Sequence, residues 1–563
     1  MKNIKIQNKV FLFLIILLGF ILRIYNISSA PPSLNWDEVS HGYNAYSILK
    51  TGRDEWGQFL PLTNFRAYGD YPLPLNLYLT IPSILFLGLS EFSIRFPHVL
   101  MGTLTILATY FLTYGVTRKR SISLLASLLF AVEPWSLFSS RFVVQSNPAT
   151  LFLISAGALF VNRDKHKYFL PLSFTAFLTT LFSYHATRIF TPIFLLFIVR
   201  KEILSALRVD KIVRVLSVAI LALVMITTQI VLLSKDAQAR ARWLFLIDDT
   251  AVSRIIEKRN ESQLPEFATR LLYNRPTYFL KEFTKNYLGY FSPRFLFING
   301  GTQYQFSVPN HGILYLANLP FFYLGLGILL MKSLKSKSYR FLLLWLILSP
   351  IPASITNEKF AVIRATTMLP IPMILSALGL ISSVNWLKQF KLLETKYKII
   401  YVIYFVFLAG FVENYLNIYF NDYKKAFSWS WQYGYKEVFN YAKENYSKYD
   451  KIVITKKYGE PHEFLLFFWP WDPAKYRNDS NLIRFNQSNW FWVDRFDKFY
   501  FVNDWNIPKE EWQSFVLESG MEFNCENQKC LLITSPDNYP KRWNKLETIN
   551  YLDGKPAFEI YEN

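Results

Sequence analysis

The chain has 563 residues and a formal net charge of +20, and 52% of its residues are hydrophobic. Its Lys and Arg residues lie in short clusters between apolar windows, without the basic stripe on a soluble module that nucleic-acid binding requires, so we exclude a nucleic-acid partner. Apolar windows near the ~20 residues that cross a bilayer recur along the first three quarters of the chain, which predicts an integral membrane protein embedded in a lipid bilayer.

The basic clusters predict the topology, because cytoplasmic loops of membrane proteins are enriched in Lys and Arg. Lys2, Lys5 and Lys9 precede the first apolar window and place the N-terminus inside. If the later clusters are cytoplasmic too, the chain has about eleven spans and its C-terminus lies outside. The predicted spans are residues 10–24, 97–116, 121–138, 149–162, 168–184, 189–200, 215–233, 313–331, 341–355, 367–386 and 399–416.

The apolar stretch Leu75–Leu89 fits either of two roles. It is short and interrupted by proline, so we expect a helix that lies along the outer membrane surface. A true span here would put several basic clusters outside, which the charge rule disfavours.

This topology predicts a transmembrane domain, residues 1–414, and a soluble domain outside the membrane, residues 415–563. Within the first, residues 27–97 form the first outer loop with membrane-surface helices, and residues 235–310 form a large outer loop. The tail contains strand-like runs such as 451–455, 499–502 and 531–534, which predict an α/β fold.

The chain has two cysteines, Cys525 and Cys530, both in the tail. A disulfide would fit an oxidising exterior, and two reduced thiols are the alternative.

Two adjacent carboxylates follow the first span in the sequence Asn35-Trp36-Asp37-Glu38. Acids beside a membrane are costly unless they are paired or used, so this pair marks a candidate site. The structural alternative is that Asp37 caps a helix over Glu38–Lys50. Asp70, in Gly69-Asp70-Tyr71, is a third acid, for which a turn residue is the alternative.

The order of these motifs resembles a known family. A first span, an outer Trp-Asp-Glu, a helix ending in Lys50-Thr51-Gly52, Gly69-Asp70-Tyr71 before prolines, and Glu91–Pro97 follow one another. Ser140-Arg141 and Tyr184–Arg188 continue the match. The chain is similar to the protein O-mannosyltransferase-like enzymes of glycosyltransferase family 39, which include the aminoarabinose transferases and belong to the C-type membrane glycosyltransferases. The resemblance covers most of residues 10–385 but not the tail.

The resemblance implies a polytopic α-helical membrane protein with about eleven transmembrane helices and a C-terminal α/β extracytoplasmic domain. It implies transfer of a mannose-like hexose or a pentose, with inversion, from a polyprenyl-phosphate donor to a glycan, lipid or protein acceptor on the outer face. Asp37 matches the family's base, and a carboxylate can take the proton of an acceptor hydroxyl. Glu38 is a second catalytic candidate, which orients Asp37 or raises its pKa by like-charge proximity. Asp70, Tyr71 and His311 are candidates for positioning acceptor or donor.

The departing lipid phosphate needs cations. Arg141, Arg188 and Arg364 fall at outer ends of predicted spans, where a guanidinium can hold phosphate oxygens bidentately. Each of the three has an alternative role as an interfacial anchor. His185 is a further candidate for the donor phosphate.

One departure from the family pattern adds weight to the arginines. Related enzymes often carry a Lys before the prolines after the second acidic position, and Pro72-Leu73-Pro74 contains none. Some C-type enzymes hold a divalent metal between acids of separate outer loops. Residues 141–148 contain no carboxylate, so a metal is possible but not favoured, and no other cofactor is expected.

A transporter or flippase of lipid-linked sugars is the alternative function. Transporters tend to show charges at mid-membrane depth and interrupted helices in matching halves. The sequence has no repeated half, and Glu133 is the exceptional mid-membrane charge. The positive-inside pattern without a cleavable signal predicts a prokaryotic cytoplasmic membrane, with the active site and C-terminus facing outside.

Overall fold

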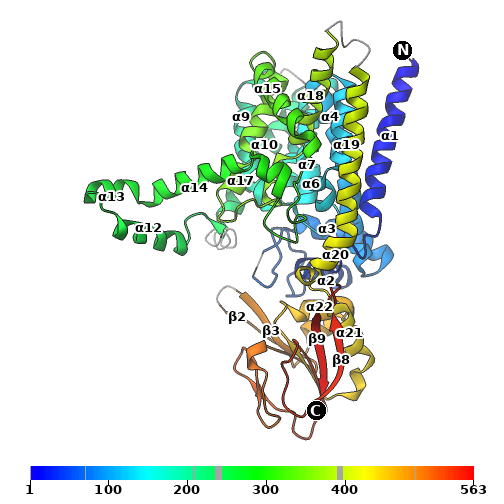
Figure 1. Ribbon diagram of the computed structural model, residues 1–563, viewed down its shortest axis with the longest axis vertical. Coiled ribbons are helices and arrows are strands. Elements are labelled where there is room, and N and C mark those ends of the chain that lie inside the picture. The colour runs from blue at the N-terminus through cyan, green and yellow to red at the C-terminus, as the bar shows by residue number, and fades with distance from the viewer. Residues whose placement is uncertain (1, 70, 207–209, 235–243, 390–396, 488–489) are drawn as a thin grey trace. The chain divides into compact units, whose positions relative to one another are not determined.

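The computed structural model describes residues 2–69, 71–206, 210–234, 244–389, 397–487 and 490–563 (Figure 1). Its contacts divide the chain into two compact units. The helical unit consists of Met1–Tyr25, His98–Ser140 and Val144–Leu416. The sheet unit consists of Asn26–Pro97, Arg141–Val143 and Asn417–Asn563.

The helical unit has helices wherever the sequence predicts a span. They are α1 (Lys2–Ile24), α4 (Glu91–Thr117), α5 (Arg120–Val132), α6 (Pro134–Ser139), α7 (Ser146–Val161), α8 (Phe169–Thr180), α9 (His185–Ala206), α10 (Lys211–Leu232), α15 (Leu319–Ser333), α16 (Lys337–Leu348), α17 (Ile351–Ser354), α18 (Ile371–Leu387) and α19 (Tyr397–Asn417). Among the described residues, five stretches are long and apolar enough to cross a membrane: Gln7–Ile24, Glu91–Thr117, Lys211–Leu232, Leu316–Ser333 and Ile399–Ala426. The chain is therefore a polytopic membrane protein.

Glycines let two of these helices approach closely. A Cβ atom at Gly325 in α15 would lie 1.9 Å from the carbonyl oxygen of Leu375 in α18. One at Gly379 in α18 would lie 1.9 Å from the carbonyl oxygen of Phe321. Small residues at such crossings supply the packing that holds helices together in lipid, where the hydrophobic effect does not.

Two buried charged groups of the helical unit form hydrogen bonds within that unit. Arg23 of α1 donates to the carbonyl oxygens of Ala131 (2.9 Å) and Phe130 (3.1 Å), where α5 ends. Glu133 accepts hydrogen bonds from the backbone N–H of Tyr315 (2.8 Å) and from the side chain of Asn318. Because an unpaired buried polar group is costly, these bonds explain how the buried Glu133 carboxylate is tolerated.

The described part of the predicted large outer loop, residues 244–310, is mostly helical. It forms α12 (Asp249–Glu261), α13 (Glu266–Leu272) and α14 (Arg275–Gly289), which project from the helical unit in Figure 1. Residues 235–243 of this loop lie outside the described residues.

The sheet unit is built on a mixed seven-stranded sheet with the strand order β2-β3-β4-β1-β7-β9-β8. The strands are β1 (Lys451–Thr455), β2 (Ile483–Gln487), β3 (Trp490–Phe496), β4 (Phe499–Val502), β7 (Cys530–Thr534), β8 (Asn544–Asn550) and β9 (Pro556–Glu562), and a separate pair is β5 (Phe515–Val516) with β6 (Glu522–Phe523). The central β1 runs parallel to both β4 and β7. The three strand-like runs of the sequence are β1, β4 and most of β7, so the predicted α/β fold is confirmed.

The first segment after α1 shares a hydrophobic core with the C-terminal residues. This core joins α2 (Trp36–Thr51) and α3 (Pro74–Leu87) to α21 (Tyr435–Glu444), α22 (Pro461–Phe468) and the sheet. Where α2 meets α22, a Cβ atom at Gly42 would lie 2.5 Å from the ring of Phe467. The sequence did not predict this grouping, and the division into domains 1–414 and 415–563 stays a prediction.

The helix expected over Leu75–Leu89 is present as α3, and its place along the membrane surface stays a prediction.

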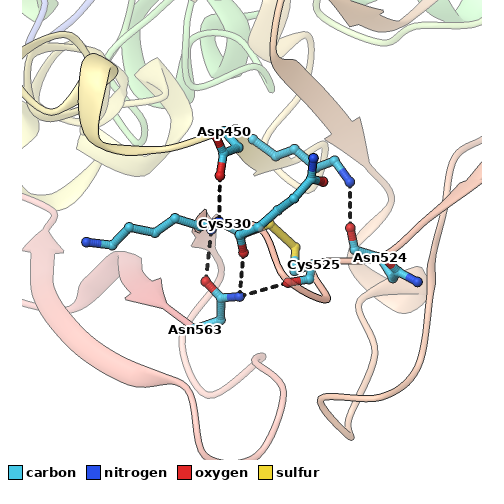
Figure 2. The surroundings of a disulfide bond; sticks show 8 residues. Asp450, Asn524, Cys525, Cys530 and Asn563 are labelled. Atoms are coloured by element: carbon cyan, nitrogen blue, oxygen red, sulfur yellow. Dashed lines mark hydrogen bonds between the residues drawn. A yellow bond between two sulfur atoms is a disulfide. The ribbon is translucent and has the colours of Figure 1, made fainter.

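Cys525 and Cys530 form a disulfide beside the edge of β7 (Figure 2). The side chain of Asn563 accepts a hydrogen bond from the Cys530 N–H (2.9 Å) and donates to the Cys525 carbonyl (3.1 Å). Of the two alternatives left open by the sequence, the structure therefore has the bridge, which joins the loop before β7 to the first residue of that strand, and Asn563 bonds to both cysteines.

Candidate functional site

The N-terminus of α2 is defined by Asn35. Its side chain accepts a hydrogen bond from the Glu38 N–H (2.9 Å), and the Glu38 carboxylate accepts one from the Asn35 N–H (3.4 Å). This is a capping box. The alternative reading of Asp37 as the helix cap is wrong, because Asn35 holds the cap position and the helix begins at Trp36. Asp37 lies in the first turn of α2.

Glu38 forms a fully buried ion pair with Arg95; both side chains are 0% exposed. The guanidinium donates to both carboxylate oxygens, Nε to Oε1 at 2.8 Å and Nη2 to Oε2 at 2.7 Å. The backbone N–H of Val143 donates to Oε1 as well (2.9 Å). Geometry of this kind offsets the cost of burying two charges, and removal of one partner would leave the other uncompensated.

Arg95 also organises the backbone that leads into α2. It donates to the carbonyl oxygens of Ile27 (3.0 Å), Pro31 (3.1 Å) and Ser33 (2.5 Å). The Arg95 guanidinium thus binds both the backbone that precedes α2 and the carboxylate of Glu38 in the first turn of that helix.

Asp37 is exposed, in contrast to Glu38. Its Oδ1 accepts a hydrogen bond from the Tyr68 hydroxyl. The Tyr68 ring is buried, with its centroid 5.8 Å from that of Trp36 and 5.6 Å from that of Trp490. Burial, and secondarily the nearby charge of Asp37, raise the pKa of Tyr68 well above its ordinary value. The hydroxyl therefore keeps its proton at neutral pH and stays a donor to Asp37.

Arg141, predicted to bind the donor phosphate, is also in the sheet unit and fully buried. Its Nη2 donates to the Ala30 carbonyl (2.9 Å) and its Nε to the Tyr419 hydroxyl (3.3 Å). The guanidinium also lies 4.8 Å from the centroid of the Phe420 ring. These contacts fix the loop before α2 to the chain that follows α19.

The three other donor-phosphate candidates come together in the helical unit. His185, Arg188 and Arg364 line one pocket of about 160 Å³. His185 begins α9 and Arg188 follows one turn later on the same helix face, because residues three apart are neighbours on a helix. Arg364 begins η4 (Arg364–Met368).

Each arginine of this pocket has a partner. Arg188 Nε donates to the Leu181 carbonyl (2.9 Å), and Arg364 forms an ion pair with Glu358 (3.0 Å from Nη1 to Oε2). The pocket thus combines two guanidinium groups and one imidazole with apolar walls, a lining suited to an amphiphilic anion.

The remaining predicted positions are dispersed. Tyr71 packs edge-on against Phe491 of β3, with ring centroids 6.3 Å apart. His311 is in the helical unit, where its Nδ1 lies 3.2 Å from the Pro309 carbonyl oxygen. Asp70 lies outside the described residues.

Sequence reasoning missed the partners that organise these sites. Arg95 stands within the Glu91–Pro97 motif and Tyr68 directly precedes Gly69-Asp70-Tyr71, yet no role was assigned to either. Glu358 precedes Arg364 by six residues, and this opposite charge in the same short segment was the signal for an ion pair.

Residues 13–235 match the family model described as dolichyl-phosphate-mannose-protein mannosyltransferase. Over this segment, the chain is similar to that family. The family resemblance inferred from the order of motifs is thereby confirmed, and the matched segment contains Asp37, Glu38, Arg141 and Arg188.

Solved structures are similar to this chain at low sequence identity. The archaeal oligosaccharyltransferase AglB from Archaeoglobus fulgidus, in complex with an inhibitory peptide and a dolichol-phosphate, is 17% identical with a TM-score of 0.51. The match covers 82% of this chain, which spans 64% of the length of AglB. ArnT from Cupriavidus metallidurans, bound to undecaprenyl phosphate, is 10% identical with a TM-score of 0.48, over 98% of this chain and 97% of that one. A search of curated proteins gives no match.

Proposed function

We propose that this protein is a membrane glycosyltransferase that moves a sugar from a polyprenyl-phosphate donor to an acceptor on the outer face of a prokaryotic plasma membrane, with inversion. One observation carries the proposal. Asp37, within the segment that matches the mannosyltransferase family, is an exposed carboxylate whose orientation is held by a buried tyrosine hydroxyl. The family's name and the dolichol-phosphate of AglB support the donor class.

Asp37 acts as the general base. An acceptor hydroxyl is a poor nucleophile at neutral pH, and Asp37 takes its proton as the new bond to the anomeric carbon forms. The bond from that carbon to the phosphate oxygen breaks at the same time, and its electron pair leaves with the polyprenyl phosphate. Attack from the side opposite the phosphate inverts the anomeric carbon. Tyr68 orients Asp37, which limits the freedom that the reacting groups must lose.

Glu38 is a positioning residue in this mechanism. Its carboxylate is occupied by Arg95 and the Val143 N–H, so it sets where the first turn of α2 begins. The sequence-based prediction gave Glu38 a catalytic role; we assign the proton transfer to Asp37 alone.

The pocket of His185, Arg188 and Arg364 is our proposed site for the donor phosphate. Charge-assisted hydrogen bonds from guanidinium groups stabilise the charge that develops on the leaving phosphate. Two further assignments stay predictions: Arg141 as a phosphate ligand, and Asp70, Tyr71 and His311 as positioning residues. The acceptor is a glycan, a lipid or a protein, and the sugar is a mannose-like hexose or a pentose.

The experiment is sugar transfer by purified protein in liposomes, with a panel of polyprenyl-phosphate sugars and acceptors of the three classes. The proposal predicts release of polyprenyl phosphate together with a product of inverted anomeric configuration. A flippase would instead make the lipid-linked sugar accessible on the opposite leaflet without releasing polyprenyl phosphate. That result would support a transporter function and refute the proposed transferase function. Glu133 offers no open mid-membrane charge for transport, because Tyr315 and Asn318 hold its carboxylate.

A further inference from the structure

A second group of ionisable side chains is buried in the sheet unit, outside the site described above. It consists of Glu55, in the loop after α2, with His462 and Glu463 of α22, and their side chains are at most 2% exposed. One potential ligand atom from each residue lies within 4.8 Å of the other two. His462 Nε2 and Glu463 Oε1 are 3.8 Å apart.

The Arg484 guanidinium acts electrostatically on Glu55 and donates to its backbone carbonyl (3.2 Å), but it forms no ion pair with the carboxylate in the described part of the chain. Within the described ranges, no Lys or Arg forms an ion pair with either Glu55 or Glu463. Glu55 accepts a hydrogen bond from the Asn44 side chain (3.2 Å). Neither oxygen of Glu463 has a hydrogen bond of ordinary geometry, although Glu55 and Ser40 lie beside it. Burying such charges is costly unless a partner neutralises them.

Another acid lies behind the histidine of this group, just beyond hydrogen-bond distance. Its Nδ1 lies 3.6 Å from Oε2 of Glu460, while its Nε2 faces Glu463. A carboxylate behind an imidazole is the usual arrangement for histidines that bind metal ions, because it fixes the ring and increases the basicity of the ligating nitrogen. Glu460 is itself held by the indole N–H of Trp490 (2.7 Å).

We propose that Glu55, His462 and Glu463 bind one divalent transition-metal ion, with Zn²⁺ or Mn²⁺ as the fitting class. A mixed set of imidazole and carboxylate ligands suits these ions, whereas Mg²⁺ and Ca²⁺ prefer oxygen alone. Bonds of about 2.0–2.2 Å place the ligand atoms of one ion roughly 3–4 Å apart. The 4.8 Å span of the group is close enough for small side-chain rotations to complete the site.

The ion has a structural task. It joins the loop after α2 to α22, two segments separated by about four hundred residues of chain. Glu460, which lies behind His462, accepts a hydrogen bond from the indole of Trp490. The Trp490 ring packs against Tyr68, whose hydroxyl donates to Asp37. The site therefore stabilises the surroundings of Asp37 without touching the substrate. The metal site and the proposed transferase activity are independent proposals, and either can be refuted without the other.

The test uses the full-length protein in detergent, stripped with a chelator and then titrated separately with Zn²⁺, Mn²⁺ and Mg²⁺. Bound metal per chain is measured by elemental mass spectrometry, and the unfolding temperature is recorded for each state. We expect one Zn²⁺ or Mn²⁺ per chain, a higher unfolding temperature with that ion, and no stoichiometric Mg²⁺. Absence of a stoichiometric ion from the wild-type protein overturns the proposal, and leaves Glu55 and Glu463 sharing a proton.

Variants locate the ion. Glu463→Gln and His462→Asn should abolish stoichiometric binding, and Glu460→Gln, which keeps an acceptor for Trp490, should weaken it roughly 10–100-fold. Exposed residues of the same types, Glu547 and His166, provide the matched controls Glu547→Gln and His166→Asn, which should bind as the wild type does. An ion retained by both Glu463→Gln and His462→Asn would place it elsewhere and refute the assignment. If these two variants fail to fold, Glu460→Gln and the wild-type titration decide the question.

Discussion

Breaking the Glu38–Arg95 pair should destabilise the sheet unit strongly. Glu38→Gln removes the negative charge while keeping the shape, and it leaves the guanidinium of Arg95 buried without its counter-ion. Removal of one partner from a buried pair costs about 3–5 kcal/mol. Each kcal/mol shifts the unfolding temperature of a unit of this size by about 2–4 °C, so a fall on the order of 10 °C is expected. Arg95→Met should cost a similar amount, because it leaves Glu38 charged and frees three backbone carbonyls.

Thermal unfolding of the purified protein, followed by tryptophan fluorescence, measures this cost. The matched control is a second ion pair of the same unit, Lys436 with Glu91, whose side chains are 49% and 17% exposed. Lys436→Met should cost less than about 1 kcal/mol, because water screens the exposed pair. The double variant Glu38→Gln, Arg95→Met should lose less than the sum of its parts. If Glu38→Gln is no more destabilising than Lys436→Met, the reasoning about the buried pair is refuted.

Three further predictions concern single contacts. Tyr68→Phe keeps the ring between Trp36 and Trp490 but removes the hydrogen bond to Asp37. Since hydrogen bonds to charged groups contribute about 1.5–3 kcal/mol, kcat should fall at least about tenfold with KM unchanged. An unchanged kcat would exclude a positioning role for Tyr68. Arg188→Gln should weaken polyprenyl phosphate binding by about tenfold or more in a calorimetric titration, and equal affinity would remove Arg188 from the phosphate site. Burial lowers the pKa of His41 from 6.5 to about 3. The unfolded chain therefore gains a proton on His41 below pH 6.5 that the folded protein does not take up until about pH 3, and stability falls as the pH falls. In His41→Gln, the slope of unfolding free energy between pH 5 and 6 should drop by about 1 kcal/mol per pH unit, and an unchanged slope contradicts this origin.

The spans and the strands of the tail could be predicted because their signals are local. Apolar length and the placement of Lys and Arg suffice for the helices, and β-branched and aromatic runs suffice for β1, β4 and β7. The alternative role considered for Asp37, as the cap of α2, was two residues too late, because Asn35 is the cap. Both residue types cap helices, and only the backbone conformation distinguishes them.

Pairings over long distances could not be predicted from one sequence. Glu38 and Arg95 are 57 residues apart, and nothing in either motif shows that they face each other. The family resemblance led to Asp37 and Glu38 together, and the different fates of these neighbours, one exposed and one buried, depend on the packing of α2. Glu55, His462 and Glu463 meet only because α2 and α22 share a core, which no pattern within either segment encodes.

The central claim is that Asp37 is the base of a sugar transfer. Its most direct test is the rate of polyprenyl phosphate release by reconstituted wild-type protein compared with Asp37→Asn, with Asp249→Asn, at an exposed acid in the first turn of α12, as the control. The account predicts that Asp37→Asn binds donor and keeps the wild-type unfolding temperature while turnover falls by about 100-fold or more, and that Asp249→Asn turns over normally. Turnover by Asp37→Asn at the wild-type rate would contradict it.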